Sequence, residues 1–183
     1  MALVATVDSV ERPMSWDAFL ALPGGARAEY SEGVAIVTPP PTFEHQEICQ
    51  RLREALKSRL GSDTVVAVAT GWVRPSISWT RIPDLMVLTH APAGGDVVTN
   101  PPAVVIEVLS SNRRDDLVAK SVEYHREGAE QYWIVDPRDR VIDVFSRAAS
   151  AWRRIHRLSD NDPTVIVSTR VGDVTLQLAE ILR

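Results

Sequence analysis

Apolar residues recur at helical spacing in several stretches of the chain. The clearest stretch is 43–61, where apolar side chains return every fourth position and Gly61 ends the pattern. A shorter amphipathic pattern covers 14–23 and stops at a Pro-Gly-Gly sequence. We predict helices over these two segments, over 115–129, and over 175–183 at the end of the sequence.

Short apolar runs separated by turn residues predict strands in the remaining segments. Two extended pieces, roughly 27–31 and 34–38, are separated by Glu32-Gly33, which suits a hairpin turn. The run 103–110 is apolar on both faces except for Glu107, as expected for a central strand that is covered on both sides. Further strands are predicted at 64–74, 82–89, 130–137, and, as a hairpin, 141–147 and 151–158.

The order of these elements indicates the fold class. Helix, hairpin, helix, three strands, helix and further strands are typical of an α/β or α+β fold with a mixed central sheet. The chain has 183 residues, of which 45% are hydrophobic, so it is long enough for one domain with its own core. We therefore expect a single domain over 1–183, with 1–13 either flexible or forming an edge strand.

Composition and charge indicate in which compartment the protein works and which partners it binds. Cys49 is the only cysteine, so neither an internal disulfide nor a zinc site built from several cysteines is available, as is usual in a reducing cytoplasm. The N-terminal stretch has no basic leader, and no segment approaches the roughly 20 apolar residues that a membrane helix needs. We expect a cytoplasmic protein with no membrane partner. The net charge of −4 argues against indiscriminate nucleic-acid binding, although arginines cluster at 113–114 and 153–157.

Two acids stand where the sequence otherwise predicts burial. Asp84 follows Pro83 at the mouth of the strand 82–89, and Glu107 lies inside the strand 103–110. A buried carboxylate needs a cation, several donors or a metal ion. If the strands are neighbours, the acids can converge and hold Mg²⁺. The structural alternative is that Asp84 caps a turn or that Glu107 pairs with an arginine in the core.

Other candidate residues have equally ordinary explanations. Lys120 lies four residues after Asp116 and could form a solvated intrahelical ion pair with it. Tyr124 lies on the same helical face as Lys120 and could line a pocket or simply pack. Glu29 precedes a tyrosine in an extended piece. His45 lies in the first turn of a helix, where it could face an anion or solvent.

Taken in order, these residues resemble a known family. The pair "PD" at 83–84, "VVIEVLSS" at 104–111 and "DDLVAKSVEYHREGAEQYWIVDP" at 115–137 are similar to the Uma-two family of the PD-(D/E)XK nuclease superfamily. The upstream "AEYSEGVAIVTPPPTFEHQ" at 28–46 resembles the family's opening, although the family more often has a form like "YELIDG" there. The resemblance covers roughly 14–145.

The resemblance implies a restriction endonuclease-like core and a set of site residues. It implies that Asp84 and Glu107 are metal ligands for Mg²⁺ or Mn²⁺, with the backbone carbonyl of Val108 as a third ligand. The superfamily lysine would stand two residues after Glu107, where this chain has Leu109, so Lys120 on the next helix becomes the catalytic lysine. Glu29 matches the family's early glutamate as a further catalytic carboxylate. Substrate-binding roles are expected for His45, which matches the family's histidine, and for Tyr124.

Three functional hypotheses follow. The first is a metal-dependent endonuclease that hydrolyses phosphodiester bonds in DNA and acts as a homodimer, because two sites related by two-fold symmetry can cut both strands. The second is a catalytically degenerate nuclease fold that binds nucleic acid or a protein partner without cleavage. The third is an assembly role, in which the strand 130–137 and the following hairpin form a dimer contact, with either Tyr132 or Trp133 facing outward.

Overall fold

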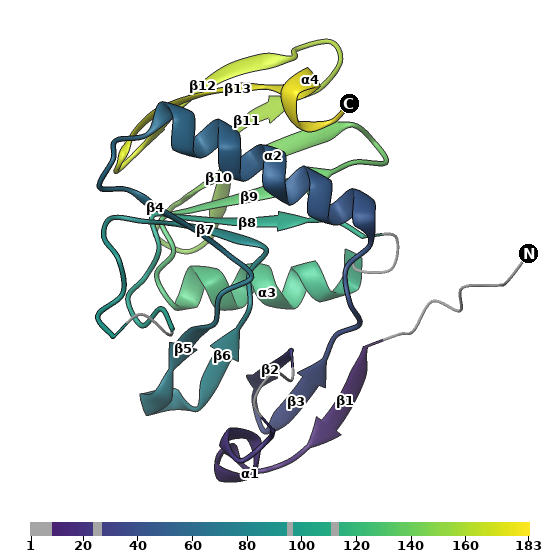
Figure 1. Ribbon diagram of the computed structural model, residues 1–183, viewed down its shortest axis with the longest axis vertical. Helices are drawn as coiled ribbons and strands as arrows, with labels where there is room; N and C mark the ends of the chain where they lie inside the picture. The colour runs from purple at the N-terminus through teal and green to yellow at the C-terminus, as the bar shows by residue number, and fades with distance from the viewer. Residues whose placement is uncertain (1–8, 24–26, 95–96, 111–113) are drawn as a thin grey trace, which may run out of the picture.

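The central element of the structure is a mixed sheet with a long helix on each face. The computed structural model describes residues 9–23, 27–94, 97–110 and 114–183, except for the side chains of 114–116. Six strands form this sheet in the order β11-β10-β9-β8-β7-β4, and only the β8–β9 pair is parallel. Figure 1 shows α2 and α3 on opposite sides of it. The strand bounds are β4 Val65–Val68, β7 Leu85–Leu88, β8 Val104–Val108, β9 Gln131–Asp136, β10 Val141–Arg147 and β11 Trp152–Leu158.

Alternation along the central strands separates two cores. Leu85 and Val87 of β7 face the same core as α2, whereas Met86 and Leu88 face the core on the α3 side. Helix α2 spans Phe43–Arg59 and begins at the N-cap Thr42. Helix α3 spans Arg114–Arg126 and links β8 to its parallel neighbour β9, as a parallel pair requires.

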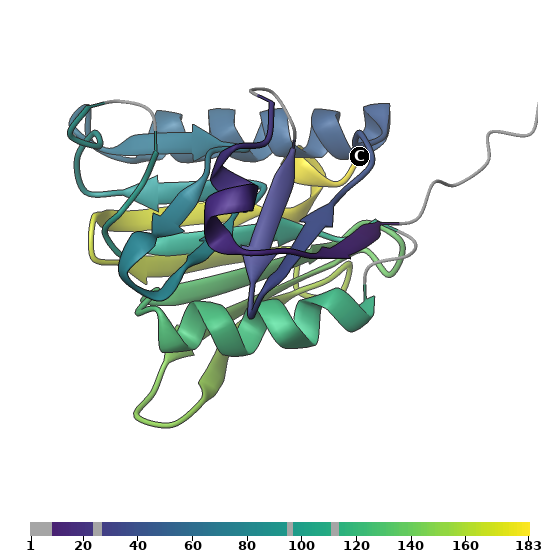
Figure 2. The same ribbon diagram turned by 90° about the horizontal axis from the view of Figure 1, so that it is seen from below.

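A smaller sheet lies at the lower end of the molecule in Figure 1 and in front in Figure 2. Its strand order is β1-β3-β2-β6-β5, with the short helix α1 (Trp16–Leu20) beside it. Glu32 and Gly33 both have positive φ, 51° and 84°, which is the conformation of a two-residue hairpin turn. The bounds are β1 Val10–Pro13, β2 Ala28–Ser31, β3 Val34–Val37, β5 Trp72–Arg74 and β6 Trp79–Arg81, with a 3-10 turn at Pro75–Ile77.

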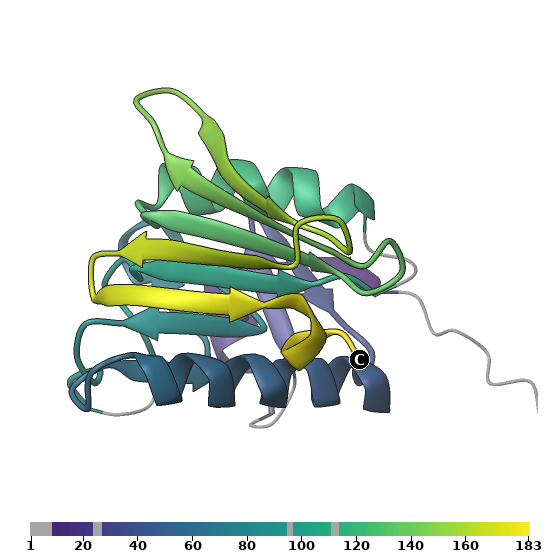
Figure 3. The same cartoon turned by 90° about the horizontal axis from the view of Figure 1, so that it is seen from above.

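The C-terminal segment completes the core on the α2 side. Strands β12 (Thr164–Thr169) and β13 (Gly172–Gln177) form a hairpin that lies beside α2 (Figure 3), followed by the short helix α4 (Leu178–Ile181). Buried side chains from β12, β13 and α4 join the same cluster as α2. Among the helices in the described part of the chain, none is long and apolar enough to cross a membrane.

Most predicted elements are confirmed, with small shifts in their bounds. The mixed sheet flanked by helices is observed, and Val10–Pro13 is an edge strand of the smaller sheet, paired with β3. The β2–β3 and β10–β11 hairpins also form. The rest of the predicted 1–13 segment, residues 1–8, lies outside the described residues.

Three predictions were wrong or incomplete, and two strands were missed. The segment 64–74 is not one strand, because the chain turns at Ala69, whose φ is 47°, and continues as β5 in the other sheet. The segment 175–183 is mostly strand β13, because its apolar side chains alternate with period two, and only α4 is helical. Strands β6 and β12 were not predicted. Tyr132 and Trp133 of β9 are both buried, so neither of these two side chains faces outward as was expected.

Candidate active site

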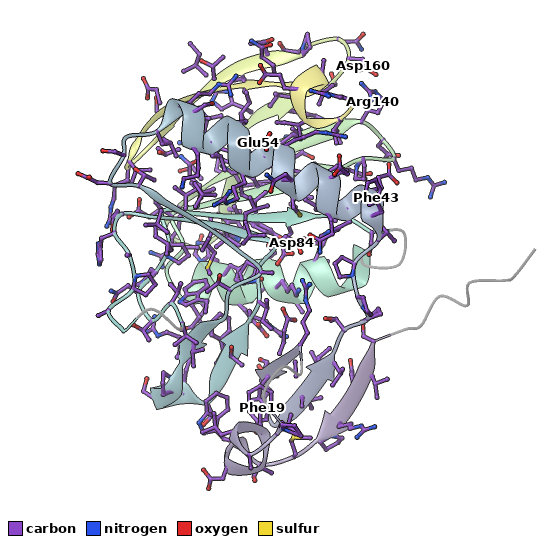
Figure 4. All side chains as sticks on the ribbon, in the orientation of Figure 1. Phe19, Phe43, Glu54, Asp84, Arg140 and Asp160 are labelled. Carbon is purple, nitrogen blue, oxygen red and sulfur yellow. The ribbon has the colours of Figure 1, made fainter. Side chains whose placement is uncertain are left out.

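Two buried carboxylates come together where β7 and β8 lie side by side. Asp84 directly precedes β7, Glu107 lies within β8, and each is 2% exposed. Leu85 pairs with Ile106 in antiparallel register, so extending the register by one residue places Asp84 opposite Glu107. Opposite residues of antiparallel strands have Cβ atoms about 4.5–5.5 Å apart. Figure 4 shows Asp84 near the centre of the molecule, between α2 and α3.

Asp84 is surrounded by donors from three separate segments. Its Oδ2 atom accepts a hydrogen bond from the backbone N–H of Val108 (2.9 Å) and lies 3.1 Å from His45 Nε2. Its Oδ1 atom lies 3.7 Å from the guanidinium of Arg27. These contacts stabilise an ionised carboxylate in a buried position and join the start of β7 to the end of β8.

Helix α3 brings two further side chains to Glu107. Lys120 and Tyr124 are one turn apart and therefore share a face of the helix. The Tyr124 hydroxyl donates to Glu107 Oε1 at 2.6 Å, and Lys120 Nζ lies 3.7 Å from the same oxygen. Burial, followed by the charges of Glu107 and Glu29, raises the pKa of Tyr124 well above its usual value, so the hydroxyl stays protonated and donates.

Glu29 reaches the same group from the smaller sheet. Its Oε1 atom accepts a hydrogen bond from the backbone N–H of Ile82 (2.9 Å) and lies 3.2 Å from Lys120 Nζ. Lys120 therefore lies between two carboxylates, Glu29 and Glu107, with its side chain 1% exposed. The partner that the sequence offered for Lys120, Asp116, has a side chain outside the described residues.

Next to Glu29 lies a buried ion pair that the sequence did not reveal. Arg81 donates to both carboxylate oxygens of Glu123, at 2.6 and 2.8 Å, and also to Glu29 Oε2 at 3.3 Å. Trp79 Nε1 and Ser31 Oγ donate to Glu123 as well. We call Arg81 and Glu123 the rear ion pair, because it joins α3 to the smaller sheet behind Lys120.

Both members of the rear ion pair are charged. Burial alone lowers the pKa of Arg81, but the hydrogen bond and charge of Glu123 and the charge of Glu29 raise it above its usual value. Burial alone raises the pKa of Glu123, yet the hydrogen bond and charge of Arg81, with the donors Trp79 and Ser31, lower it below its usual value. The one sequence signal for this pair is that Glu123 follows Lys120 by three positions on the same helix.

His45 is oriented by its own helix. The N-cap Thr42 accepts a hydrogen bond from the His45 backbone N–H, and Cys49, one turn later, has its Sγ atom 3.6 Å from His45 Nδ1. Burial, then the charges of Asp84 and Glu107, raise the pKa of Cys49 to about 12. The protonated thiol can donate to Nδ1, so the Nε2–H is the one that donates to Asp84.

A pocket of about 350 Å³ opens beside His45. Leu109 and Ser110 line it just beyond β8, and Arg138 lines it just beyond β9. His45 both lines this pocket and contacts Asp84, so this histidine connects the pocket with the pair of acids, which lie behind it.

Comparison with known proteins gives the family. The model of the Uma2 family, described as "Putative restriction endonuclease", matches residues 16–179, which is most of the chain. The chain belongs to the Uma2 family. A crystal structure described as a "putative nuclease" of DUF820 from Anabaena variabilis has a TM-score of 0.73 and 18% identity, over 93% of this chain and 98% of that one. A comparison with curated proteins returned no match.

Membership in the Uma2 family confirms the resemblance found in the sequence, and the structural likeness confirms the nuclease-type fold. In this Uma2 protein Leu109, which stands where the superfamily more often has lysine, lines the pocket instead of supplying a charge. Lys120 of α3 brings its ammonium close to Glu107 from another direction. The structure thus brings Glu29, Asp84, Glu107, Lys120 and Tyr124 into one buried group, with His45 at its edge.

The oxygen atoms of this group are suitable ligands for a hard divalent cation. Asp84 and Glu107 offer carboxylate oxygens, and the Val108 carbonyl is the backbone oxygen adjacent to Glu107. Mg²⁺ takes oxygen ligands and commonly uses one or two carboxylates, with water and phosphate completing the shell. The like charges of the two acids repel in a region of low dielectric, and Arg27 and Lys120 offset part of that repulsion.

Proposed function

We propose that this chain is a metal-dependent endonuclease that hydrolyses phosphodiester bonds in DNA. The observation that carries the proposal is the meeting of two buried carboxylates, Asp84 and Glu107, with Lys120 beside them. A purely structural arrangement would gain little from burying three charged groups, since such groups are costly to desolvate. The family description, "Putative restriction endonuclease", supports the same activity.

In the proposed mechanism the acids hold Mg²⁺ or Mn²⁺, with the Val108 carbonyl as a further ligand. When bound, the ion polarises the phosphate and lowers the pKa of a water molecule. The oxygen of a water molecule forms a bond to phosphorus, the bond from phosphorus to the leaving oxygen breaks, the water loses one proton to solvent, and the leaving oxygen takes one proton from solvent. His45, which lines the pocket, is placed to contact the substrate next to Asp84.

The remaining side chains orient the acids and the cationic group. Lys120 Nζ is placed to orient the attacking water or to stabilise the charge that develops on the phosphate oxygens. Glu29 fixes Lys120 through the 3.2 Å contact, and Tyr124 fixes Glu107 through the 2.6 Å hydrogen bond. Because its hydroxyl donates to Glu107, Tyr124 is proposed to position that carboxylate, in place of the substrate-binding role expected from the sequence.

The direct test is cleavage of DNA by the pure protein. We expect supercoiled plasmid to be nicked and linearised with Mg²⁺ or Mn²⁺, and to stay intact with a chelator. An RNA of matched length, incubated in parallel, distinguishes the two nucleic acids. If calorimetry shows metal binding but neither nucleic acid is cut, the degenerate binding module is supported and the endonuclease is contradicted.

Lys120→Met is expected to reduce the cleavage rate by about 10²–10³-fold, as removal of one group that stabilises transition-state charge typically does. Methionine keeps much of the length of the side chain and removes its charge. Metal binding, measured by calorimetry, is expected to persist, because the change takes a competing cation away from Glu107. A Lys120→Met protein that binds metal and cleaves DNA at the wild-type rate would contradict this role.

We also propose that two copies act together, because two sites related by a two-fold axis can cut both strands of a duplex. Light scattering of the pure protein is expected to give twice the mass of one chain at concentrations that linearise plasmid. A single-chain mass under those conditions would contradict the dimer and leave the single site untouched.

A further inference from the structure

A second set of metal-binding groups shares Asp84 with the pair of acids. His45 and Cys49 lie one turn apart on α2, and their ligating atoms and a carboxylate oxygen of Asp84 all lie within 4.8 Å of one another. We propose that His45, Cys49 and Asp84 form a site for a soft divalent ion such as Zn²⁺, and that this ion competes with Mg²⁺ for Asp84. The zinc site stands on its own, whereas the competition rests on the proposed function.

The three side chains lie close enough together to reach one ion after a local adjustment. Bonds of about 2.0–2.3 Å in a tetrahedron place the ligand atoms about 3.3–3.8 Å apart. In the structure His45 Nε2 lies 3.1 Å from Asp84 Oδ2, and Cys49 Sγ lies 3.6 Å from His45 Nδ1. One imidazole gives one nitrogen to an ion, so a rotation of the His45 ring is the adjustment that binding requires. Water would complete the shell.

Burial and charge favour a cation at this place. His45, Cys49 and Asp84 are 6%, 3% and 2% exposed, so the ligands are already removed from water. Asp84 and Glu107 are acidic neighbours of Cys49, so its Sγ atom lies in a negative field. A divalent ion would offset that field. On binding, the S–H bond breaks, the S–metal bond forms and the proton leaves to water, with no change of oxidation state.

The ligand types separate the two sites. Thiolate and imidazole select Zn²⁺ and similar soft ions, whereas Mg²⁺ takes oxygen and dehydrates reluctantly. A hard ion would therefore use Asp84 with Glu107, and a soft ion would use Asp84 with His45 and Cys49. Because both need Asp84, occupation by Zn²⁺ would exclude Mg²⁺ and switch the catalytic site off.

Absorption spectroscopy with Co²⁺ as a probe tests the soft site without an activity assay. We expect the full chain to show an intense near-ultraviolet thiolate-to-cobalt band that Zn²⁺ removes by displacement. Cys49→Ser, which keeps the size and a hydroxyl donor to His45, is expected to lose the band, and Glu107→Gln is expected to keep it. Identical spectra for wild type and Cys49→Ser, both folded by circular dichroism, would overturn the site.

Calorimetry then tests the competition. We expect one equivalent of Zn²⁺ to abolish the heat of Mg²⁺ binding in the wild type and to leave it unchanged in Cys49→Ser. If Mg²⁺ binds equally well to the zinc-loaded wild type, the competition is overturned. If the cobalt band is present but DNA is never cut, the proposed function fails and the zinc site stands, so the two failures are distinguishable.

Discussion

Asp84→Asn and Glu107→Gln are each expected to lower the rate of metal-dependent DNA cleavage by on the order of 10³-fold or more. A bound ion supplies several kcal/mol of transition-state stabilisation, and about 1.4 kcal/mol corresponds to a factor of ten. Each substitution keeps the shape of the side chain and removes the charge that would hold the ion. Plasmid cleavage at saturating Mg²⁺ measures the rate, and calorimetry measures the loss of metal binding.

A matched control comes from an acid elsewhere on the same sheet. Asp143 of β10 pairs with Arg154 and Arg157 at 3.4 and 3.7 Å, away from the pair of acids. Asp143→Asn is therefore expected to cleave within about twofold of the wild type, since changes to exposed ion pairs have small effects. Cleavage that survives in Asp84→Asn and in Glu107→Gln would contradict the proposed metal site.

Arg81→Met is expected to lower the free energy of unfolding by about 3–5 kcal/mol, because it leaves Glu123 buried without its cation. Glu29 loses a donor in the same change. Urea denaturation followed by circular dichroism measures the effect. The double variant Arg81→Met/Glu123→Met removes both charges of the rear ion pair, and we expect it to recover much of the lost stability.

The control for this change is an arginine in an exposed ion pair. Arg154 is half-exposed and contacts Asp143, so Arg154→Met is expected to change stability by no more than about 1 kcal/mol. If Arg81→Met lowers the free energy of unfolding no more than Arg154→Met does, the rear ion pair does not stabilise the contact between α3 and the smaller sheet. The rear ion pair would then not help to hold Lys120 in place.

The site could be anticipated in part because its key residues break a local pattern. Asp84 and Glu107 interrupt apolar runs, and the neighbouring strands that carry them could be expected from their order. Lys120 and Tyr124 share a helical face, so one correct helix places both. Asp84 accepts a hydrogen bond from the backbone N–H of Val108 in the neighbouring strand. A side chain that caps a turn would instead bind a backbone group close to it in the sequence.

The rear ion pair was missed for a physical reason. Arg81 and Glu123 are 42 residues apart, and each alone is an ordinary charged residue in an element with polar positions. Only the docking of the smaller sheet against α3 makes them partners. The break at Ala69 has only an indirect local signal, because a positive φ is expected at glycine or asparagine, and here Ala69 takes it instead of Gly71.

The C-terminal error has a different source. The buried residues Val174, Leu176 and Leu178 recur at every second position, as in a strand. The residues that follow form the short helix α4, so the segment 175–183 contains both the strand period and the helix period. Strand β12 was missed for a related reason, since only Val167 of its six residues is buried and its pairing with β13 places it. Pairing of β12 with β13 in one hairpin decided these elements.

A crystal structure of the protein grown with Mn²⁺ tests the central proposal most directly, because anomalous scattering locates the ion without assumption. We predict an ion bound by one carboxylate oxygen of Asp84 and one of Glu107, with the Val108 carbonyl beside it. Metal–oxygen distances of about 2.0–2.3 Å to both carboxylates are expected. An ion bound elsewhere, with Asp84 and Glu107 too far apart to share one, would contradict the proposed catalytic site.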